Sequence, residues 1–375
     1  MANPFHYGEV VRGTDFTDRE NDLKNIVSEL SGQIRIFMVS PRRYGKTSLI
    51  VRALEELKSK GRPTVYVDLF RASSIEEFVD IYAKSLFASI EGGVEKAIRL
   101  IKEMLPSLSP EVTIDEEGKP SLSLGLKRAK ARYMEDIFDL PERIAKKRGR
   151  RVVVAFDEFQ EIAELGGARI EKMLRSYIQT HESVSYLFAG FKRHVLTEMV
   201  MNRSRAFFGM GKLMSLDKIP ENLFCQYILD KFRRTGYKTD VATTLAIIRE
   251  ADNVPNNVQM LCHELWEICR DRKVVEEKDI KESIGSLVKT QSVLYSAAWD
   301  SISLHQRRLL KAIALEGEVQ APTASDFIQR YNLGSAASVQ RSMQRLIERD
   351  ILDKQEAGLA FTDAFMKDWI RLKIV

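Results

Sequence analysis

The chain has 375 residues, of which 58 are Lys or Arg and 53 are Asp or Glu, so its net charge is +5. At about 100–200 residues per domain this length predicts two or three domains, and 44% hydrophobic residues with only 20 Gly and 10 Pro exclude a collagen-like or largely disordered chain. The longest apolar runs have about five residues, against about 20 for a bilayer span, and the first residues lack the pattern of a secretory signal. We therefore expect a soluble, cytoplasmic protein without a membrane segment.

Strands and helices are predicted to alternate along the first 218 residues. Helical patterns cover about 18–30, 46–60, 75–105 and 130–148, and apolar runs of strand length cover 34–39, 64–68, 151–158, 184–189 and 212–216. This alternation predicts a parallel sheet with helices on both faces. Residues 112–125 alternate apolar and polar side chains around a Glu-Gly turn, which predicts a β-hairpin outside the main sheet.

The rest of the chain is predicted to be mostly helical. Residues 221–290 show helical patterns with a break at 253–257. Helical patterns over 303–315, 323–331 and 335–350 precede a short β-wing over 351–362, which is the order of elements in a winged helix. We expect three domains: an α/β domain over 1–218, a helical domain over 219–295 and a winged helix over 296–375.

The segment 40–48 (SPRRYGKTS) lies between a predicted strand and a predicted helix, as a P-loop does. The backbone N–H groups of such a loop surround a phosphate, and the helix N-terminus adds partial positive charge. Lys46 would reach the β- and γ-phosphates, and Thr47 would offer its hydroxyl to Mg²⁺. Ser40 stands where the pattern has its first glycine. The residues expected to contact the nucleotide here are Pro41, Arg42, Arg43, Tyr44, Gly45, Lys46, Thr47 and Ser48.

A second motif ends the strand predicted over 151–158. Asp157 at its tip is expected to hold Mg²⁺ through water, and Glu158 is expected to polarise the attacking water as a general base. For Asp157 alone, an N-cap of the next helix is the alternative. Together the two motifs predict a P-loop NTPase sheet that binds ATP or GTP with Mg²⁺, with catalytic roles for Lys46, Asp157 and Glu158.

Basic residues follow the strand predicted over 184–189. Lys192 and Arg193 lie where a side chain would sense the γ-phosphate, so Arg193 is a further candidate catalytic residue; the alternative is a solvated side chain that opens a helix. Arg203 and Arg205 would serve as arginine fingers, or form surface salt bridges, which is the more common role of such residues.

With these motifs placed, the chain resembles the archaeal-type ATPase family, in the STAND branch of the AAA-type P-loop ATPases. The resemblance spans essentially the whole chain and is most specific at 41–49 and 156–160. Residues 15–20 (DFTDRE) are similar to the family's Phe-x-Gly-Arg-Glu box near the adenine, which implies that Phe16 and Arg19 contact the nucleotide, although Asp18 replaces the glycine.

A second point of resemblance lies in the helical region. Asn253-Val-Pro255 is similar to the family's Gly-x-Pro, and the resemblance implies that Pro255 packs near the nucleotide. Asn253 suits the glycine position because Asn also adopts a left-handed backbone. The family further implies an adenine-specific switch: ADP favours a closed state of the helical and winged-helix domains, ATP favours an open one, and slow hydrolysis resets it. Its output would pass through an unknown protein partner or through self-assembly.

The winged helix leaves a second function open. Arg341, Arg345 and Arg349 form one stripe on the helix predicted over 335–350, as the recognition helix of a DNA-binding winged helix would. Residues 323–375 nevertheless hold eight basic and seven acidic side chains, a weak footprint for a DNA reader. The alternative is a DNA-binding AAA-type ATPase, similar to an origin-recognition protein or a transposition helper. A third option is a scaffold that holds ADP permanently. Glu158 argues against it, because a site that never hydrolyses ATP does not need a general base.

Overall fold

The computed structural model describes residues 2–11, 16, 19–90, 93–104, 111–114, 120–123, 131–317, 319–355 and 358–374. The chain forms two compact units. One is Val10–Asp217, and the other combines Met1–Glu9 with Lys218–Val375. No helix in the described ranges has the length and hydropathy to cross a lipid bilayer.

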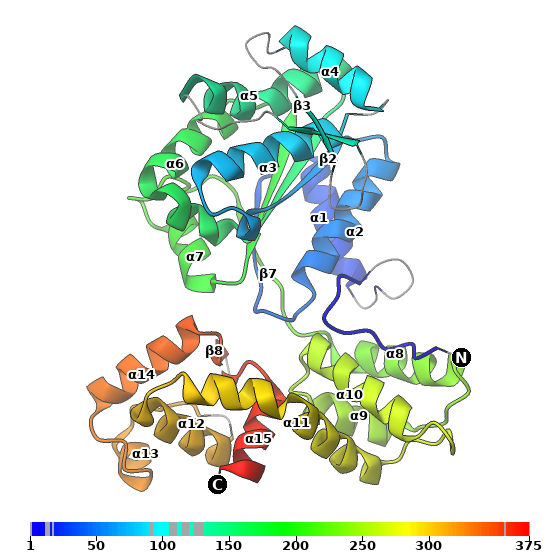
Figure 1. The fold of residues 1–375 in the computed structure, drawn as a ribbon, viewed down its shortest axis with the longest axis vertical. Helices are drawn as coiled ribbons and strands as arrows, with labels where there is room; N and C mark the ends of the chain where they lie inside the picture. Colours follow the sequence, from blue (N-terminus) through cyan, green and yellow to red (C-terminus); the bar gives the residue numbers. More distant parts are fainter. Residues whose placement is uncertain are drawn as a thin grey trace. The chain divides into compact units, whose positions relative to one another are not determined.

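A five-stranded sheet forms the centre of the unit Val10–Asp217 (Figure 1). Its strand order is β2-β5-β6-β1-β7, and every neighbouring pair is parallel. Its central strands β5 and β6 are buried along their whole length, which is why they are almost continuously apolar. The strands are β1 (Ile36–Val39), β2 (Thr64–Asp68), β5 (Val152–Asp157), β6 (Val184–Gly190) and β7 (Lys212–Ser215).

Helices cover both faces of this sheet, as the alternating pattern predicts (Figure 1). Helices α1 (Glu20–Ser31) and α2 (Lys46–Ser59) lie on one face. The other face is covered by α3 (Ile75–Ala88), α5 (Ala131–Arg148), α6 (Ile162–Ile178) and α7 (Arg193–Met201). On that face the rings of Phe156 and Phe188 stack at 5.8 Å between centroids, within a core of fully buried aromatic side chains.

Two local predictions for this unit are refined by the structure. The helix predicted over 75–105 is two helices, because α3 ends at Ala88 and α4 (Gly93–Met104) begins after a break near two glycines. The predicted hairpin is confirmed as the antiparallel pair β3 (Glu111–Ile114) and β4 (Pro120–Ser123). Its expected turn lies outside the described residues.

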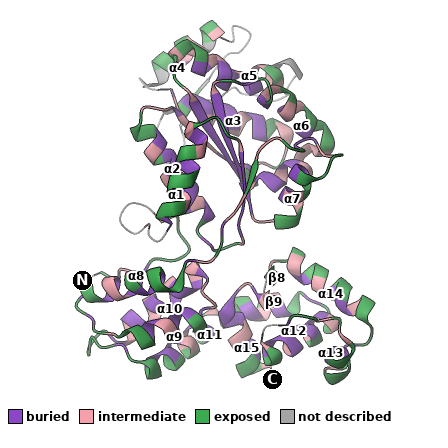
Figure 2. Ribbon diagram, turned by 180° about the vertical axis from the view of Figure 1, so that it is seen from behind, coloured by how far each residue is buried: buried purple, intermediate pink, exposed green. Residues whose placement is uncertain are grey.

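The second unit is predominantly helical and has its own apolar core, which is the buried interior seen in Figure 2. Its helical part contains α8 (Glu221–Arg234), α9 (Val241–Glu250), α10 (Pro255–Ile268) and the long α11 (Glu277–Asp300). The winged-helix order follows: α12 (Leu304–Glu316), α13 (Ser325–Arg330), α14 (Ala336–Glu348), β8 (Leu352–Gln355) and β9 (Gly358–Phe361).

One helix of this unit was not predicted from the sequence. Helix α15 (Ala364–Lys373) follows the wing, and its N-cap is Asp363, whose side chain accepts a hydrogen bond from the Phe365 N–H. The break predicted at 253–257 is shorter than expected. Asn253 has a left-handed backbone (φ 50°), and Pro255 already occupies the first turn of α10 because its fixed φ suits that position.

Candidate active site

The loop after β1 has the backbone that anion binding requires. Arg43 (φ 68°) and Gly45 (φ 83°) adopt left-handed conformations, and Gly45 is the N-cap of α2. Alternation of left- and right-handed residues turns successive N–H groups toward one side and forms a concave site for an anion. A Cβ added to Gly45 would meet no atom of the described residues within 4 Å, so the protein needs glycine there for its φ value.

Ser40 occupies its place in the loop without strain. Its φ is not left-handed, its N–H donates to the Gly190 carbonyl at 3.1 Å, and its hydroxyl donates to the Pro41 carbonyl at 3.0 Å. The side chain is 1% exposed, because β1 and β6 run parallel to this point. The departure from the glycine of the pattern is therefore compatible with the loop.

The structure brings the two sequence motifs together at the carboxyl edge of the sheet. The Lys46 ammonium, at the first residue of α2, donates to Asp157 Oδ1 and, at 2.9 Å, to Glu158 Oε1. The Thr47 hydroxyl donates to Asp157 Oδ2 at 2.7 Å. The carboxyl edge of a parallel sheet is where ligands of this fold class bind. Lys46, Thr47, Asp157 and Glu158 thus form one cluster, as the motifs predict.

Glu158 has a strained backbone. Its φ is 54°, a left-handed value that is unusual for a residue with a long side chain. The conformation is held by its N–H, which donates to Asp157 Oδ1 at 2.9 Å, and by Gln160, whose Nε2 donates to Glu158 Oε2 at 2.6 Å. Strain of this kind is common where a side chain is positioned for function.

Two residues of β2 also belong to the cluster, although no sequence motif pointed to them. The Tyr66 hydroxyl donates to Asp157 Oδ2 at 3.0 Å. Burial, with the negative charge of Asp157 next in weight, raises the pKa of Tyr66, so the hydroxyl stays a donor. Asp68 is the register partner of Asp157, and burial raises the pKa of its carboxyl as well. The signal that could have found Tyr66 is the pairing of β2 with β5, which a single sequence does not reveal.

At the end of a third strand, β6, the backbone lies close to the side chains of Gln160 and Leu196. Gly190 ends β6, and a Cβ at this position would lie 1.9 Å from Gln160 Oε1 and 2.9 Å from Leu196 Cδ1. Gln160 is 1% exposed and contacts Glu158. The glycine therefore leaves the space that Gln160 needs to hold the general-base candidate.

Arg193 lies beside the sheet tip rather than within the Lys46 cluster. It is the first residue of α7, and its Nη2 donates to Ser215 Oγ at 2.9 Å; this hydroxyl donates to Asp217 Oδ1 at 3.1 Å. Lys192 forms an ion pair with Glu161 at 3.7 Å. Arg193 is thus bonded to the end of β7.

The salt-bridge interpretation is confirmed for Arg205. Its guanidinium contacts the buried Glu171 at 2.6 Å and Glu198 at 3.1 Å. Arg203 is exposed. Because Arg205 is committed to two carboxylates within its own unit, the arginine-finger alternative has no support at this residue.

The predicted adenine-side residues are partly described. Arg19 is 7% exposed, and its Nη2 donates to the Tyr44 carbonyl at 3.2 Å, which ties the start of α1 to the P-loop. Phe16 is half-buried, and Asp18 lies outside the described residues. The Arg42 guanidinium stacks 3.8 Å from the centre of the Phe191 ring. The structure therefore brings Arg19 to the P-loop, where it contacts Tyr44.

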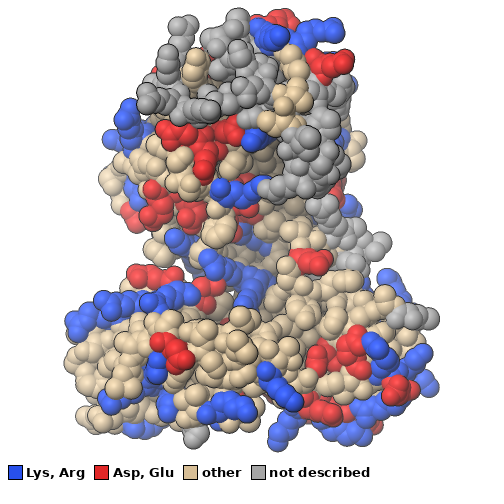
Figure 3. All heavy atoms as spheres, in the orientation of Figure 1, with Lys and Arg blue, Asp and Glu red and all other residues tan. Residues whose placement is uncertain are grey.

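The remaining predicted residues lie in the other unit. Pro255 begins α10, and Asn253 Nδ2 donates to the Ile219 carbonyl at 3.1 Å. Arg341 and Arg345 of α14 are exposed, and so is Arg349, the C-cap residue of this helix. Arg349 Nη1 donates to the Ser301 carbonyl at 2.8 Å. Figure 3 shows basic side chains along α14 with acidic ones beside them.

The residues of the carboxyl-edge cluster suit a nucleotide with Mg²⁺. Mg²⁺ binds oxygen ligands and is commonly held by one or two protein groups together with substrate phosphates. Thr47 and Asp157 supply such oxygens, and Lys46 and the N-terminus of α2 supply positive charge. A bound Mg²⁺ would neutralise negative charge on the phosphates.

Comparisons with known proteins agree with this site. Residues 16–190 match the model of a family described as an ATPase domain predominantly from Archaea. Residues 293–372 match a family described as a probable winged helix domain. No curated protein sequence matches the chain. The first match includes both the P-loop and Asp157-Glu158.

Solved structures show the same fold at low sequence identity. A Walker-type ATPase of Pyrococcus abyssi has a TM-score of 0.68 and 15% identity, with 98% of this chain and 99% of that chain covered. The ORC2 protein of Aeropyrum pernix, in ADPNP–ADP complexes, has a TM-score of 0.55 and 13% identity, with 99% of both chains covered. The ORC1 protein of Aeropyrum pernix in complex with DNA has a TM-score of 0.52 and 12% identity, with 96% and 93% covered.

Proposed function

Since residues 16–190 belong to the family of ATPase domains found predominantly in Archaea, we propose that this AAA-type ATPase is a STAND-type molecular switch that hydrolyses ATP slowly. The observation that carries the proposal is the contact of Lys46 with both Asp157 and Glu158 in one compact unit, while the helical and winged-helix regions form another. Such a division suits a protein whose nucleotide site controls the placement of a second body.

Each residue of the site has a proposed role. Lys46 binds the β- and γ-phosphates, and Thr47 and Asp157 hold Mg²⁺. Glu158 accepts a proton from the attacking water, with Gln160 fixing its carboxylate. Phe16 and Arg19 contact the adenosine, which gives specificity for ATP and ADP.

A chain of hydrogen bonds supports a route from the nucleotide to the second unit. Arg193, next to the tip of β6, bonds to Ser215 at the end of β7, and Ser215 bonds to Asp217. Asp217 is the last residue of its unit, and the chain continues from it into Lys218. We assign Arg193 the role of γ-phosphate sensor, because a change in its position would alter the segment that joins the units.

The first test is to identify the nucleotide that the protein carries. Freshly purified protein is denatured, and the released nucleotide is separated by ion-exchange chromatography. Stoichiometric ADP together with a turnover well below the enzyme median of about 10 s⁻¹ supports the switch. ADP retained with no turnover at all favours the permanently loaded scaffold, and rapid turnover contradicts a slow switch.

The second test asks whether the nucleotides select different states. Limited proteolysis of the chain around residues 216–219 is compared in ADP and in a non-hydrolysable ATP analogue, with expected differences in cleavage rate. Ser215→Ala should retain nucleotide binding and lose this difference. The control is Ser176→Ala, because Ser176 is exposed on α6 and its hydroxyl donates to the Met173 carbonyl of the same helix; this variant should keep the difference. Equal cleavage of the wild type in both nucleotides would contradict the switch.

A DNA-binding ATPase is the second candidate function. The observation that favours it is the exposure of Arg341 and Arg345 on α14 of the winged helix and of Arg349 at the C-cap of that helix. The ORC1 protein with the same fold is seen in complex with DNA. Duplex binding should then weaken with salt, and Arg341→Gln with Arg345→Gln should weaken it further, whereas the exposed Arg249→Gln on α9 should not. Salt-independent or absent binding would exclude this function.

A further inference from the structure

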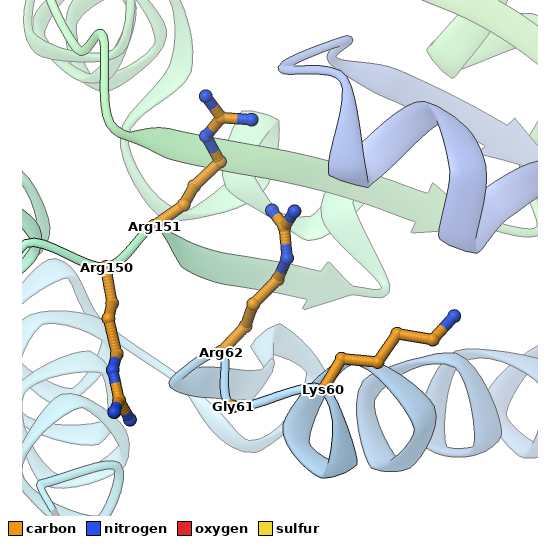
Figure 4. Close-up of a pocket in the computed structure, with 5 residues that line it drawn as sticks. All are labelled: Lys60, Gly61, Arg62, Arg150 and Arg151. Carbon is orange, nitrogen blue, oxygen red and sulfur yellow. The ribbon is translucent and has the colours of Figure 1, made fainter.

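A basic pocket lies at the amino ends of β2 and β5, away from the P-loop. It has a volume of 460 Å³ and is lined by Lys60, Gly61 and Arg62, which precede β2, and by Arg150 and Arg151, which precede β5 (Figure 4). Strand β5 runs from Val152 to Asp157. At about 3.3 Å per residue, Arg151 and Asp157 are about 20 Å apart along the strand. The pocket is therefore separate from the nucleotide site.

The charges that line this pocket are unbalanced. Of the five described residues that line it, four are cationic and none is acidic. Arg62 and Arg151 are half-buried and extend in the same direction in Figure 4, whereas Lys60 and Arg150 extend away from them. Lys60 pairs with Glu56 at 2.7 Å. Burial lowers the pKa of Arg62, and the positive charge of Arg151 lowers it further.

Arg62 and Arg151 also have N–H groups that are not engaged in hydrogen bonds with any described residue. Arg151 Nη1 donates to the Ser31 carbonyl at 2.6 Å. Arg62 Nη1 and Arg151 Nε are buried and have no hydrogen-bond partner within the described part of the chain. A buried polar atom without a partner costs about 1–3 kcal/mol. These two donors lie on neighbouring guanidinium groups, so a bound oxyanion could accept a hydrogen bond from each of them.

A second hollow extends the site along β2. It measures 240 Å³, and its lining includes Lys58 and Arg62 together with four hydroxyl residues: Thr64, Tyr66, Ser85 and Ser89. No acidic residue among those that the structure describes lines it, and Arg62 lines both hollows. Basic and hydroxyl side chains are the common partners of phosphate oxygens.

The helix dipole explains only part of this cluster. Helix α2 ends at Ser59, and basic side chains are favourable near the negative C-terminus of a helix. That effect accounts for Lys58 and Lys60. It does not account for Arg62 and Arg151, which lie in the segments that lead into β2 and β5.

We propose that Arg62 and Arg151 bind a phosphate-bearing anion in this pocket, as a second anion site of the ATPase unit. The guanidinium group presents its N–H donors in a planar fork that matches phosphate oxygens. The anion would be a free phosphorylated compound or a phosphate of a nucleic-acid backbone, because both present the same oxygens to the two arginines.

The test titrates sodium tripolyphosphate into the full chain in metal-free buffer by calorimetry. All proteins carry Lys46→Ala, so that the P-loop lysine does not compete. Arg62→Gln and Arg151→Gln should each weaken binding by about tenfold, since each loses a charge-assisted bond. Arg62→Lys keeps the charge without the fork and should be intermediate. The matched control is Arg169→Gln, which removes an exposed arginine of α6 from the same unit.

A second titration with a short oligothymidylate separates the two sources. Arg62-dependent binding of tripolyphosphate indicates a free phosphorylated compound, and Arg62-dependent binding of the oligonucleotide alone indicates a nucleic-acid backbone. Either result supports the pocket. The absence of binding with both probes, or binding that Arg62→Gln, Arg151→Gln and Arg169→Gln weaken equally, overturns it. Unfolding curves of the variants are recorded in parallel, and because the arginines repel each other, Arg62→Gln should be at least as stable as the parent without anion.

Discussion

Lys46 and Asp157 are in direct contact, although 111 positions separate them in the chain. The lysine ammonium has three N–H donors, and two of them are engaged by Asp157 and Glu158. A phosphate that binds Lys46 must use the remaining donor or displace a carboxylate. The site therefore couples phosphate binding to the position of both carboxylates.

Loss of the lysine should remove nucleotide binding. Lys46→Ala deletes the ammonium that faces the phosphates and leaves the buried Asp157 without its cation. We expect no detectable binding of fluorescent ADP by anisotropy. The control Lys172→Ala, an exposed lysine of α6, should bind as the wild type does. Wild-type affinity in Lys46→Ala would contradict the assignment.

Glu158 should be needed for turnover and not for binding. Glu158→Gln keeps the shape of the side chain but removes its basicity, so phosphate release should fall by about 10²–10⁴-fold, while ADP affinity is retained. Glu164→Gln, at an exposed position on α6, is the matched control. Hydrolysis by Glu158→Gln at the wild-type rate would exclude the general-base role.

Tyr66 should tune the Mg²⁺ site through Asp157. Tyr66→Phe removes the hydroxyl that donates to Asp157 Oδ2, so the Mg²⁺ concentration that gives half-maximal hydrolysis should rise by about tenfold. Binding of ADP without metal should be unchanged. The half-buried Tyr133 of α5 provides the control, Tyr133→Phe. An unchanged Mg²⁺ requirement in Tyr66→Phe would remove this residue from the site.

Gly190 should be needed for hydrolysis and stability because it leaves space for the side chain of Gln160. In Gly190→Ala the new Cβ would meet Gln160 and Leu196, so Gln160 must move away from Glu158. We expect weaker hydrolysis with nucleotide binding retained, and a loss of stability of about 1–3 kcal/mol.

Gly285→Ala is the control for this substitution. Gly285 lies within α11, and a Cβ there would meet no atom within 4 Å in the described ranges. Alanine should stabilise that helix by about 1 kcal/mol. If Gly190→Ala and Gly285→Ala shift the midpoint of thermal unfolding equally, the steric clash expected at Gly190 is contradicted.

Asp368 should make the stability of the second unit depend on pH. Burial raises the pKa of Asp368 to about 6, so the folded state binds a proton that the unfolded state has already released. The contribution of this carboxyl to the free energy of unfolding is therefore fully present below the ordinary aspartate pKa. It is lost as the pH rises through about 6. Asp368→Asn imitates the protonated form and should stabilise at pH 8 by on the order of 1–3 kcal/mol.

Urea unfolding at several pH values checks this prediction. The gain of Asp368→Asn over the wild type should vanish near pH 4, where both carry a neutral group. Glu348→Gln, on the exposed surface of α14, should show no such dependence. A gain of equal size at acid and alkaline pH would mean that the carboxyl is not protonated in the fold.

The sequence by itself determined the features that depend on consecutive residues. A phosphate loop is made by neighbouring backbone groups, so 40–48 could be recognised from its residues and the flanking patterns. The apolar strand that ends in Asp157-Glu158 is local in the same way. The α/β alternation and the order of the winged helix also follow from short-range periodicity.

The tertiary structure alone decided which other side chains join these motifs. Tyr66, Asp68 and Gly190 reach the site because β2 and β6 pair with β5, and a strand's neighbours depend on the packing of the whole sheet. Arg62 and Arg151 line one pocket for the same reason, since the segments before β2 and β5 are neighbours only once those strands pair. Contacts between strands are set by burial and hydrogen bonding across the sheet, and no spacing within a single stretch of sequence encodes them.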